Sequence, residues 1–148
     1  MTPDARTLTL FQRRLCHFLL ACLAYVIGLL STGIMAMRGW HDMGVGSEWG
    51  LVAFWSAILF MLLEFPLLVV MFRYQIPSKL SLQRVVVLGL CAGVVPTAVM
   101  VWGWSNRISL PALWSSPGRM WYSIFGISGV SFLWLARHLN RHVGRMGS

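Results

Sequence analysis

Residues 51–72 decide the fold, and they read LVAFWSAILFMLLEFPLLVVMF. This stretch is 22 residues long, and its only charged residue is Glu64. A helix needs about 20 consecutive apolar residues to cross the hydrocarbon core of a bilayer. Three further stretches, of 23, 20 and 17 residues, contain no Lys, Arg, Asp or Glu; they are residues 15–37, 85–104 and 120–136. The pattern predicts four transmembrane helices.

The composition is that of a membrane protein. Hydrophobic residues make up 57% of the 148 residues and charged residues 11%, whereas a soluble domain carries roughly 25% charged residues. Lipid offers the backbone no hydrogen bonds, so each stretch must be helical, and the alternating pattern of a membrane β-barrel is missing. We therefore expect an all-α integral membrane protein, with residues 1–148 forming one domain of four transmembrane helices in an up-down bundle.

The positions of the basic residues predict an orientation. Nine of the twelve Lys and Arg residues fall in residues 1–14, 73–84 and 137–148, and three fall in the two other connections. Lys and Arg concentrate in short cytoplasmic loops, so we expect both termini on the cytoplasmic side. Size, basicity and topology suit a bacterial inner (plasma) membrane, which is an argument by analogy.

Several classes of function are disfavoured. The net charge of +8 would suit nucleic acid, but the basic residues lie at the ends of apolar stretches, so we expect no nucleic-acid partner. His138 and His142 are four residues apart without a nearby carboxylate, which is weak for a metal site, and we expect neither metal nor cofactor. No catalytic motif is present, so we do not expect an enzyme.

Glu64 is the most informative polar residue, because an ionisable group inside a membrane span is a functional candidate by default. Pro66 follows two residues later and deprives the Leu62 carbonyl of its regular donor. Counted by depth in the membrane, Tyr25 and Ser128 are its expected hydrogen-bond partners. Glu64 is then either a neutral acid that holds helices together or a proton or cation site.

Small residues indicate where helices approach closely. Gly89 and Gly93 give the third stretch a small-xxx-small face, and Gly126 and Gly129 give the fourth a similar one. We expect these glycines to pack inside the protein, with contact between copies of the chain as the alternative.

Tryptophan is concentrated at one end of the stretches. Six of the eight residues fall at or near the ends facing away from the cytoplasm: Trp40, Trp49, Trp102, Trp104, Trp114 and Trp121. Interfacial tryptophan commonly anchors helices in the membrane, and the alternative is an outer face that contacts a partner.

These observations favour a small multi-pass membrane protein that acts through protein–protein contacts, as an accessory or assembly subunit or an immunity- or exclusion-type protein. Its partners are then the lipid bilayer and another membrane protein or a second copy of the chain. The alternative is an oligomeric proton- or cation-coupled transporter or channel that uses Glu64.

Overall fold

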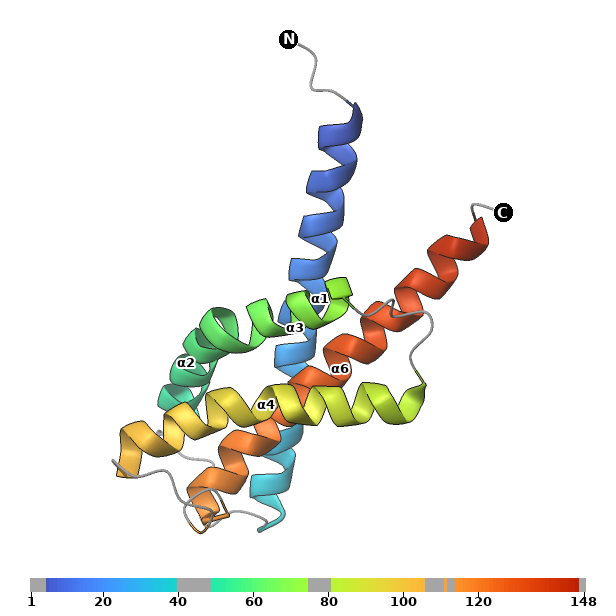
Figure 1. Cartoon of the computed structure of the whole chain (residues 1–148). Coiled ribbons are helices and arrows are strands. Elements are labelled where there is room, and N and C mark those ends of the chain that lie inside the picture. The colour runs from blue at the N-terminus through green and yellow to red at the C-terminus, as the bar shows by residue number, and fades with distance from the viewer. Residues whose placement is uncertain (1–4, 40–48, 75–80, 106–110, 112–113, 147–148) are drawn as a thin grey trace.

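The computed structural model describes residues 5–39, 49–74, 81–105, 111 and 114–146, and these are helical apart from short turns (Figure 1). The helices are α1 (Ala5–Met37), α2 (Trp49–Leu59), a π-helical turn η1 (Phe60–Glu64), α3 (Phe65–Tyr74), α4 (Leu82–Ser105) and α6 (Ser116–Met146). Because α2, η1 and α3 follow one another without a break, they form one helix with an irregular turn in its middle. The prediction of an all-α protein is confirmed for the described residues.

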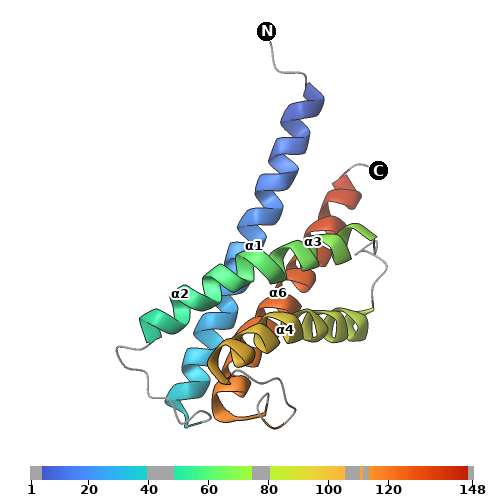
Figure 2. The same ribbon diagram turned by 60° about the vertical axis from the view of Figure 1, so that its left-hand side comes forward.

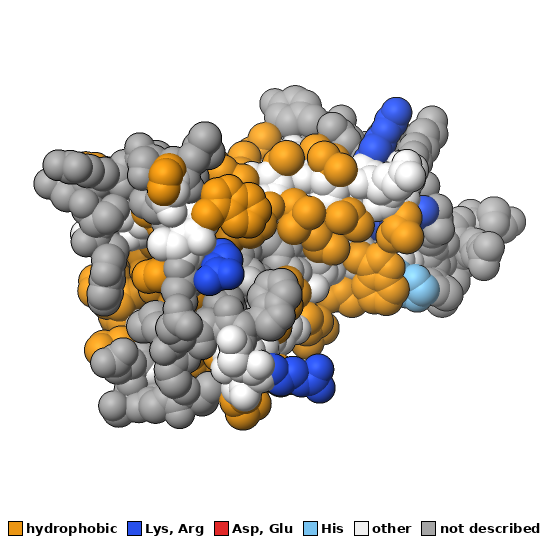
Figure 3. Space-filling model, turned by 90° about the horizontal axis from the view of Figure 1, so that it is seen from below, with side chains coloured by type: hydrophobic (Ala, Val, Ile, Leu, Met, Phe, Trp, Pro, Cys, Tyr) orange, Lys and Arg blue, Asp and Glu red, His pale blue; other side chains and the backbone are white. Residues whose placement is uncertain are grey.

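Three of the helices are long and apolar enough to cross a membrane, over Leu15–Met37, Trp49–Met71 and Leu82–Gly103. In the most apolar part of these spans only 22%, 22% and 39% of the residues are buried inside the protein. The remaining residues there are exposed or only partly buried, as expected of helices that face lipid on one side. Figure 3 shows hydrophobic side chains over much of the described surface, with few charged ones among them. The three spans indicate a membrane protein.

The fourth predicted span, residues 120–136, lies within the helix α6 but is not among the helices apolar enough to be a candidate span. Ser123, Ser128 and Ser131 alternate there with glycines and reduce its apolar character. The physical reason lies in its position, because α6 packs along both α4 and α1 and buries Ile124 and Phe125 completely. Its small and polar residues match protein neighbours rather than lipid.

The helices reverse direction from one to the next, and α6 lies along α1 and α4, but the four long segments do not form a parallel array (Figures 1 and 2). The α2–α3 helix and α4 cross α1 at a steep angle in both views. The regular up-down bundle is therefore not confirmed, and the cytoplasmic location of the termini stays a prediction.

The crossing of α4 and α6 brings two backbones into contact. A Cβ atom on Gly93 would lie 2.6 Å from the backbone nitrogen of Gly126, and one on Gly129 would lie 2.5 Å from the carbonyl oxygen of Gly89. Real Cβ atoms do not occupy such positions, so any side chain would force the helices apart. Within the described protein, all four predicted packing glycines lie at this one crossing.

A second close crossing, between α1 and α6, depends on a residue that we did not single out. A Cβ atom on Gly28 would overlap the Ser128 hydroxyl and lie 2.5 Å from the Ile124 carbonyl oxygen. Ala24, Gly28 and Thr32 recur at every fourth position of α1, and all three are buried. This spacing is the sequence signal that would have revealed the contact.

Buried hydroxyl groups in the crossings bond back to their own helix. Thr32 donates to the Gly28 carbonyl at 2.9 Å, Thr97 to the Gly93 carbonyl at 2.7 Å, and Ser128 to the Ile124 carbonyl at 2.7 Å. Each hydroxyl is thereby satisfied without a neighbouring helix, which suits surroundings without water.

We expect Gly93→Ala to lower the free energy of unfolding by about 1–3 kcal/mol, the usual cost of overpacking, because its methyl group would meet the Gly126 backbone. Gly103→Ala on the same helix is the matched control, since a Cβ atom there has nothing within 4 Å. Unfolding in detergent measures both variants. Equal effects would show that α4 and α6 are not in backbone contact.

Candidate functional site

Glu64 ends the π-helical turn in the middle of the α2–α3 helix. The backbone N–H of Phe65 donates to the carbonyl of Phe60, five residues earlier, so Met61 loses the donor it would have in an α-helix. Pro66 has no N–H, so the Leu62 carbonyl also loses its regular donor. The helix is irregular at this point because Pro66 has no N–H to continue the α-helical hydrogen-bond pattern. Two backbone carbonyls without their regular donors therefore fall within one turn of Glu64.

The Glu64 side chain is fully buried at the point where the α2–α3 helix meets α4 and α6. Its Oε1 atom lies 3.1 Å from the position that a Cβ atom on Gly129 would take, and the Gly89 carbonyl oxygen lies 2.5 Å from that same position. Phe60 and Leu68, one turn to either side on its own helix, are also fully buried. The carboxyl thus occupies the space that the glycine crossing leaves open.

Neither carboxyl oxygen of Glu64 has a hydrogen-bond partner among the described residues. The expected bond to Tyr25 or Ser128 is absent. The Tyr25 hydroxyl is 2.7 Å from the Ala53 carbonyl, to which it donates, and 2.8 Å from the Ser56 hydroxyl. Ser128 donates to its own helix and packs against Gly28.

Depth along the membrane normal was the wrong guide to a partner, because it ignores the direction in which a side chain points. Successive residues of a helix point about 100° apart, so Ser128 faces α1 while its neighbour Gly129 faces Glu64. Tyr25 is directed at α2, where its ring also lies 5.2 Å from that of Phe60 between centroids. Tyr25 therefore lies against Ser56, and Glu64 lies against Gly129.

An enclosed carboxyl without a partner has limited chemistry. In its ionised form it would be a buried charge without a counter-charge, which is far more costly than the neutral acid. It can therefore hold one proton, and release it only when water or another acceptor reaches the crossing. Among the described residues, no group of three or more His, Cys, Asp or Glu side chains could hold a metal ion.

The predicted tryptophan face divides into different environments. Trp121 is buried and stacks on Phe125 with 6.4 Å between ring centroids, and the Trp49 ring covers Gly33 of α1. Trp102 and Trp114 are 54% and 70% exposed. Trp40 and the side chain of Trp104 lie outside the described residues. Trp121 thus belongs to the packed interior and Trp49 packs against it, which anchoring at a membrane surface does not require.

No protein-family model matches the chain, and no curated protein and no solved structure matches it either. The fold and the Glu64 site therefore define the protein only as an all-helical chain with three candidate membrane-spanning helices.

We expect Glu64→Met to raise the free energy of unfolding by about 1–3 kcal/mol, the cost of a buried polar group without a partner. Methionine is close in size and has no group that requires a hydrogen bond. Tyr25→Phe is the control, because it removes hydrogen bonds that the structure contains and should lower stability by about 1 kcal/mol. Loss of stability in Glu64→Met would mean that the carboxyl has a partner.

Proposed function

We propose that the protein acts in the membrane through contacts with other membrane proteins, as an accessory, assembly, immunity or exclusion protein. The uneven packing of its helices carries this proposal. The backbone of α6 lies close to those of α1 and α4, whereas the backbones of α2 and α3 approach α1 and α4 closely at few positions and meet α1 mainly through side chains such as Tyr25. Fewer close backbone approaches therefore hold α2 and α3 to the other helices than hold α6.

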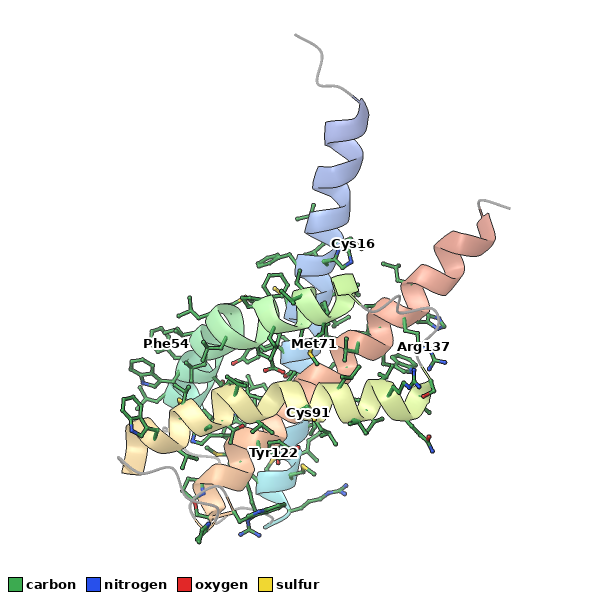
Figure 4. The ribbon with its side chains drawn as sticks, viewed as in Figure 1. Cys16, Phe54, Met71, Cys91, Tyr122 and Arg137 are labelled. Atoms are coloured by element: carbon green, nitrogen blue, oxygen red, sulfur yellow. The ribbon has the colours of Figure 1, made fainter. Side chains whose placement is uncertain are left out.

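The α2–α3 helix presents large side chains outward. Those at least half exposed are Leu51, Phe54, Trp55, Leu62 and Val70. Figure 4 shows Phe54 directed away from the other helices, and its ring lies edge-on to that of Trp55 with 5.6 Å between centroids. Aromatic side chains are enriched at protein interfaces because each contributes a large contact area at low entropic cost. A helix of a partner, or of a second copy, fits against this side.

Photo-crosslinking in native membranes tests this proposal. A photoreactive residue at position 54 or 62 should give a discrete protein adduct, because these positions are exposed on the loosely packed helix. The same residue at position 19 or 30 of α1 is the control, since Leu19 and Leu30 are equally exposed there. Adducts of similar yield at all four positions, or lipid adducts alone, would contradict the proposal.

The unpartnered carboxyl of Glu64 favours a second candidate, a proton-coupled transporter or channel, because an intramembrane acid commonly marks an ion pathway. In the described conformation the carboxyl is sealed by the glycine crossing. This candidate therefore requires the α2–α3 helix to move away from α4 and α6 during each cycle. The π-helical turn beside Glu64 is a point where such a helix bends.

Proton flux in proteoliposomes separates the two candidates. If Glu64 carries the proton, dissipation of an imposed pH gradient by the wild-type protein should fall to the level of empty vesicles in Glu64→Gln. The amide keeps the shape of the side chain but cannot exchange a proton. Wild-type vesicles that dissipate the gradient no faster than empty ones would exclude this candidate and leave the contact role in place.

A further inference from the structure

We propose that the end of the protein where α4 begins and the apolar part of α6 ends binds the phosphate headgroup of an anionic phospholipid, through Arg137 and Arg84. This site is separate from Glu64 and from the outward side of α2 and α3. It depends on no assumption about which side of the membrane holds the termini.

The antiparallel register of α4 and α6 places the two arginines at one end of the helix pair. Gly93 meets Gly126, and one turn further Gly89 meets Val130. Continued at the same spacing, this register brings Leu82, the first residue of α4, opposite Arg137. Figure 4 shows Arg137 on α6 beside the beginning of α4.

Positive charge accumulates at this end without a protein counter-charge among the described residues. The Arg137 Nε atom is buried and has no hydrogen-bond partner there, and Arg84 is exposed. The first turn of α4 adds the positive end of its dipole, and there the Ser81 hydroxyl accepts the Arg84 N–H. Glu64 is the only acidic side chain that the structure describes, and it contacts α6 at Gly129, eight residues or about 12 Å from Arg137.

Neighbouring side chains identify this level as the surface of the membrane. Trp134 is half exposed and stacks on His138, with 5.8 Å between ring centroids and 15° between ring planes. Tryptophan is enriched at the boundary between hydrocarbon and headgroups, because its ring is apolar and its N–H is polar. The apolar stretch ends at residue 136, and Arg137 follows directly.

The sequence of α6 remains basic beyond this boundary. Helix α6 runs on to Met146, and in its last ten residues Arg recurs at positions 137, 141 and 145, without an acidic residue. Figure 1 shows the end of α6 and the beginning of α1 projecting from the same side of the other helices. Basic residues just outside a membrane span attract anionic lipid.

A lipid phosphate fits this site better than free phosphate does. Guanidinium groups bind phosphate through paired hydrogen bonds, and a headgroup is held at this level by its own acyl chains. The exposed apolar side chains of α4 below the site, among them Val86 and Val87, give those chains a surface.

The test is retention of lipid by the full-length protein in mixed micelles, measured by native mass spectrometry. Wild type should retain phosphatidylglycerol in preference to phosphatidylcholine. Arg137→Gln and Arg84→Gln should each bind phosphatidylglycerol roughly fivefold more weakly, the usual effect of one basic residue near the membrane surface. Arg38→Gln is the matched control, because Arg38 is an exposed arginine beyond the opposite end of α1 and should bind like wild type.

Three outcomes would overturn the proposal. Equal loss in Arg38→Gln would reduce the effect to overall charge, and unchanged binding in Arg137→Gln and Arg84→Gln would remove the site. Displacement of the bound lipid by an equal concentration of inorganic phosphate would identify the ligand as a free anion. Circular dichroism of each variant in phosphatidylcholine shows whether it is folded. If Arg137→Gln is not, Arg137→Lys is used in its place: it keeps the charge but not the paired hydrogen bonds of a guanidinium, so it should still bind phosphatidylglycerol more weakly than wild type.

Discussion

The backbone contact between α4 and α6 is the constraint on which the rest of the structure depends. Inside a membrane, lipid chains are as apolar as leucine, so helices associate through close van der Waals packing instead of the hydrophobic effect. The glycines at positions 89, 93, 126 and 129 allow that packing, and they fix the register of the two helices. This register in turn places Gly129 of α6 against Glu64, and it places Arg137 of α6 beside the beginning of α4 (Figure 4).

The sequence predicted the helical class and three of the membrane spans, because a continuous apolar stretch of about 20 residues has few other solutions. It was less informative for α6, because Ser128 and Gly129 pack against other helices, and the local sequence does not show which helices these are. Gly28 shows the same limit, since a lone glycine in an apolar stretch signals a crossing only when Ala24 and Thr32 are read with it. The angles between the helices were beyond prediction, because they follow from contacts between segments far apart in the chain.

For Glu64, the sequence predicted the burial of the side chain but not its hydrogen-bond partner. Its burial followed from energetics, since a carboxyl exposed to hydrocarbon keeps its full transfer penalty. Its partner did not follow, because hydrogen bonding depends on the direction of a side chain to within a few tens of degrees. The Tyr25 hydroxyl is bonded to Ala53 and Ser56 of α2 instead. The resulting carboxyl without a partner is the feature of the interior that packing alone does not explain.

The π-helical turn has a consequence for the two halves of the helix that contains it. A π turn holds one residue more than the α-helical turn it replaces, so it shifts the angular phase of everything that follows by about 100°. Val52, Ser56, Phe60, Glu64 and Leu68 are all buried, so one row at every fourth residue runs from α2 through η1 into α3. In an uninterrupted α-helix such a row drifts by about 40° at each step, because four residues turn by about 400°, and the wider π turn counteracts this drift. A chain one residue shorter in η1 would turn the face of α3 by about 100° relative to that of α2. Leu68 would then rotate out of the interior while one of its neighbours rotated in. The π turn thus acts as an angular spacer that keeps the buried row of one long helix on a single side.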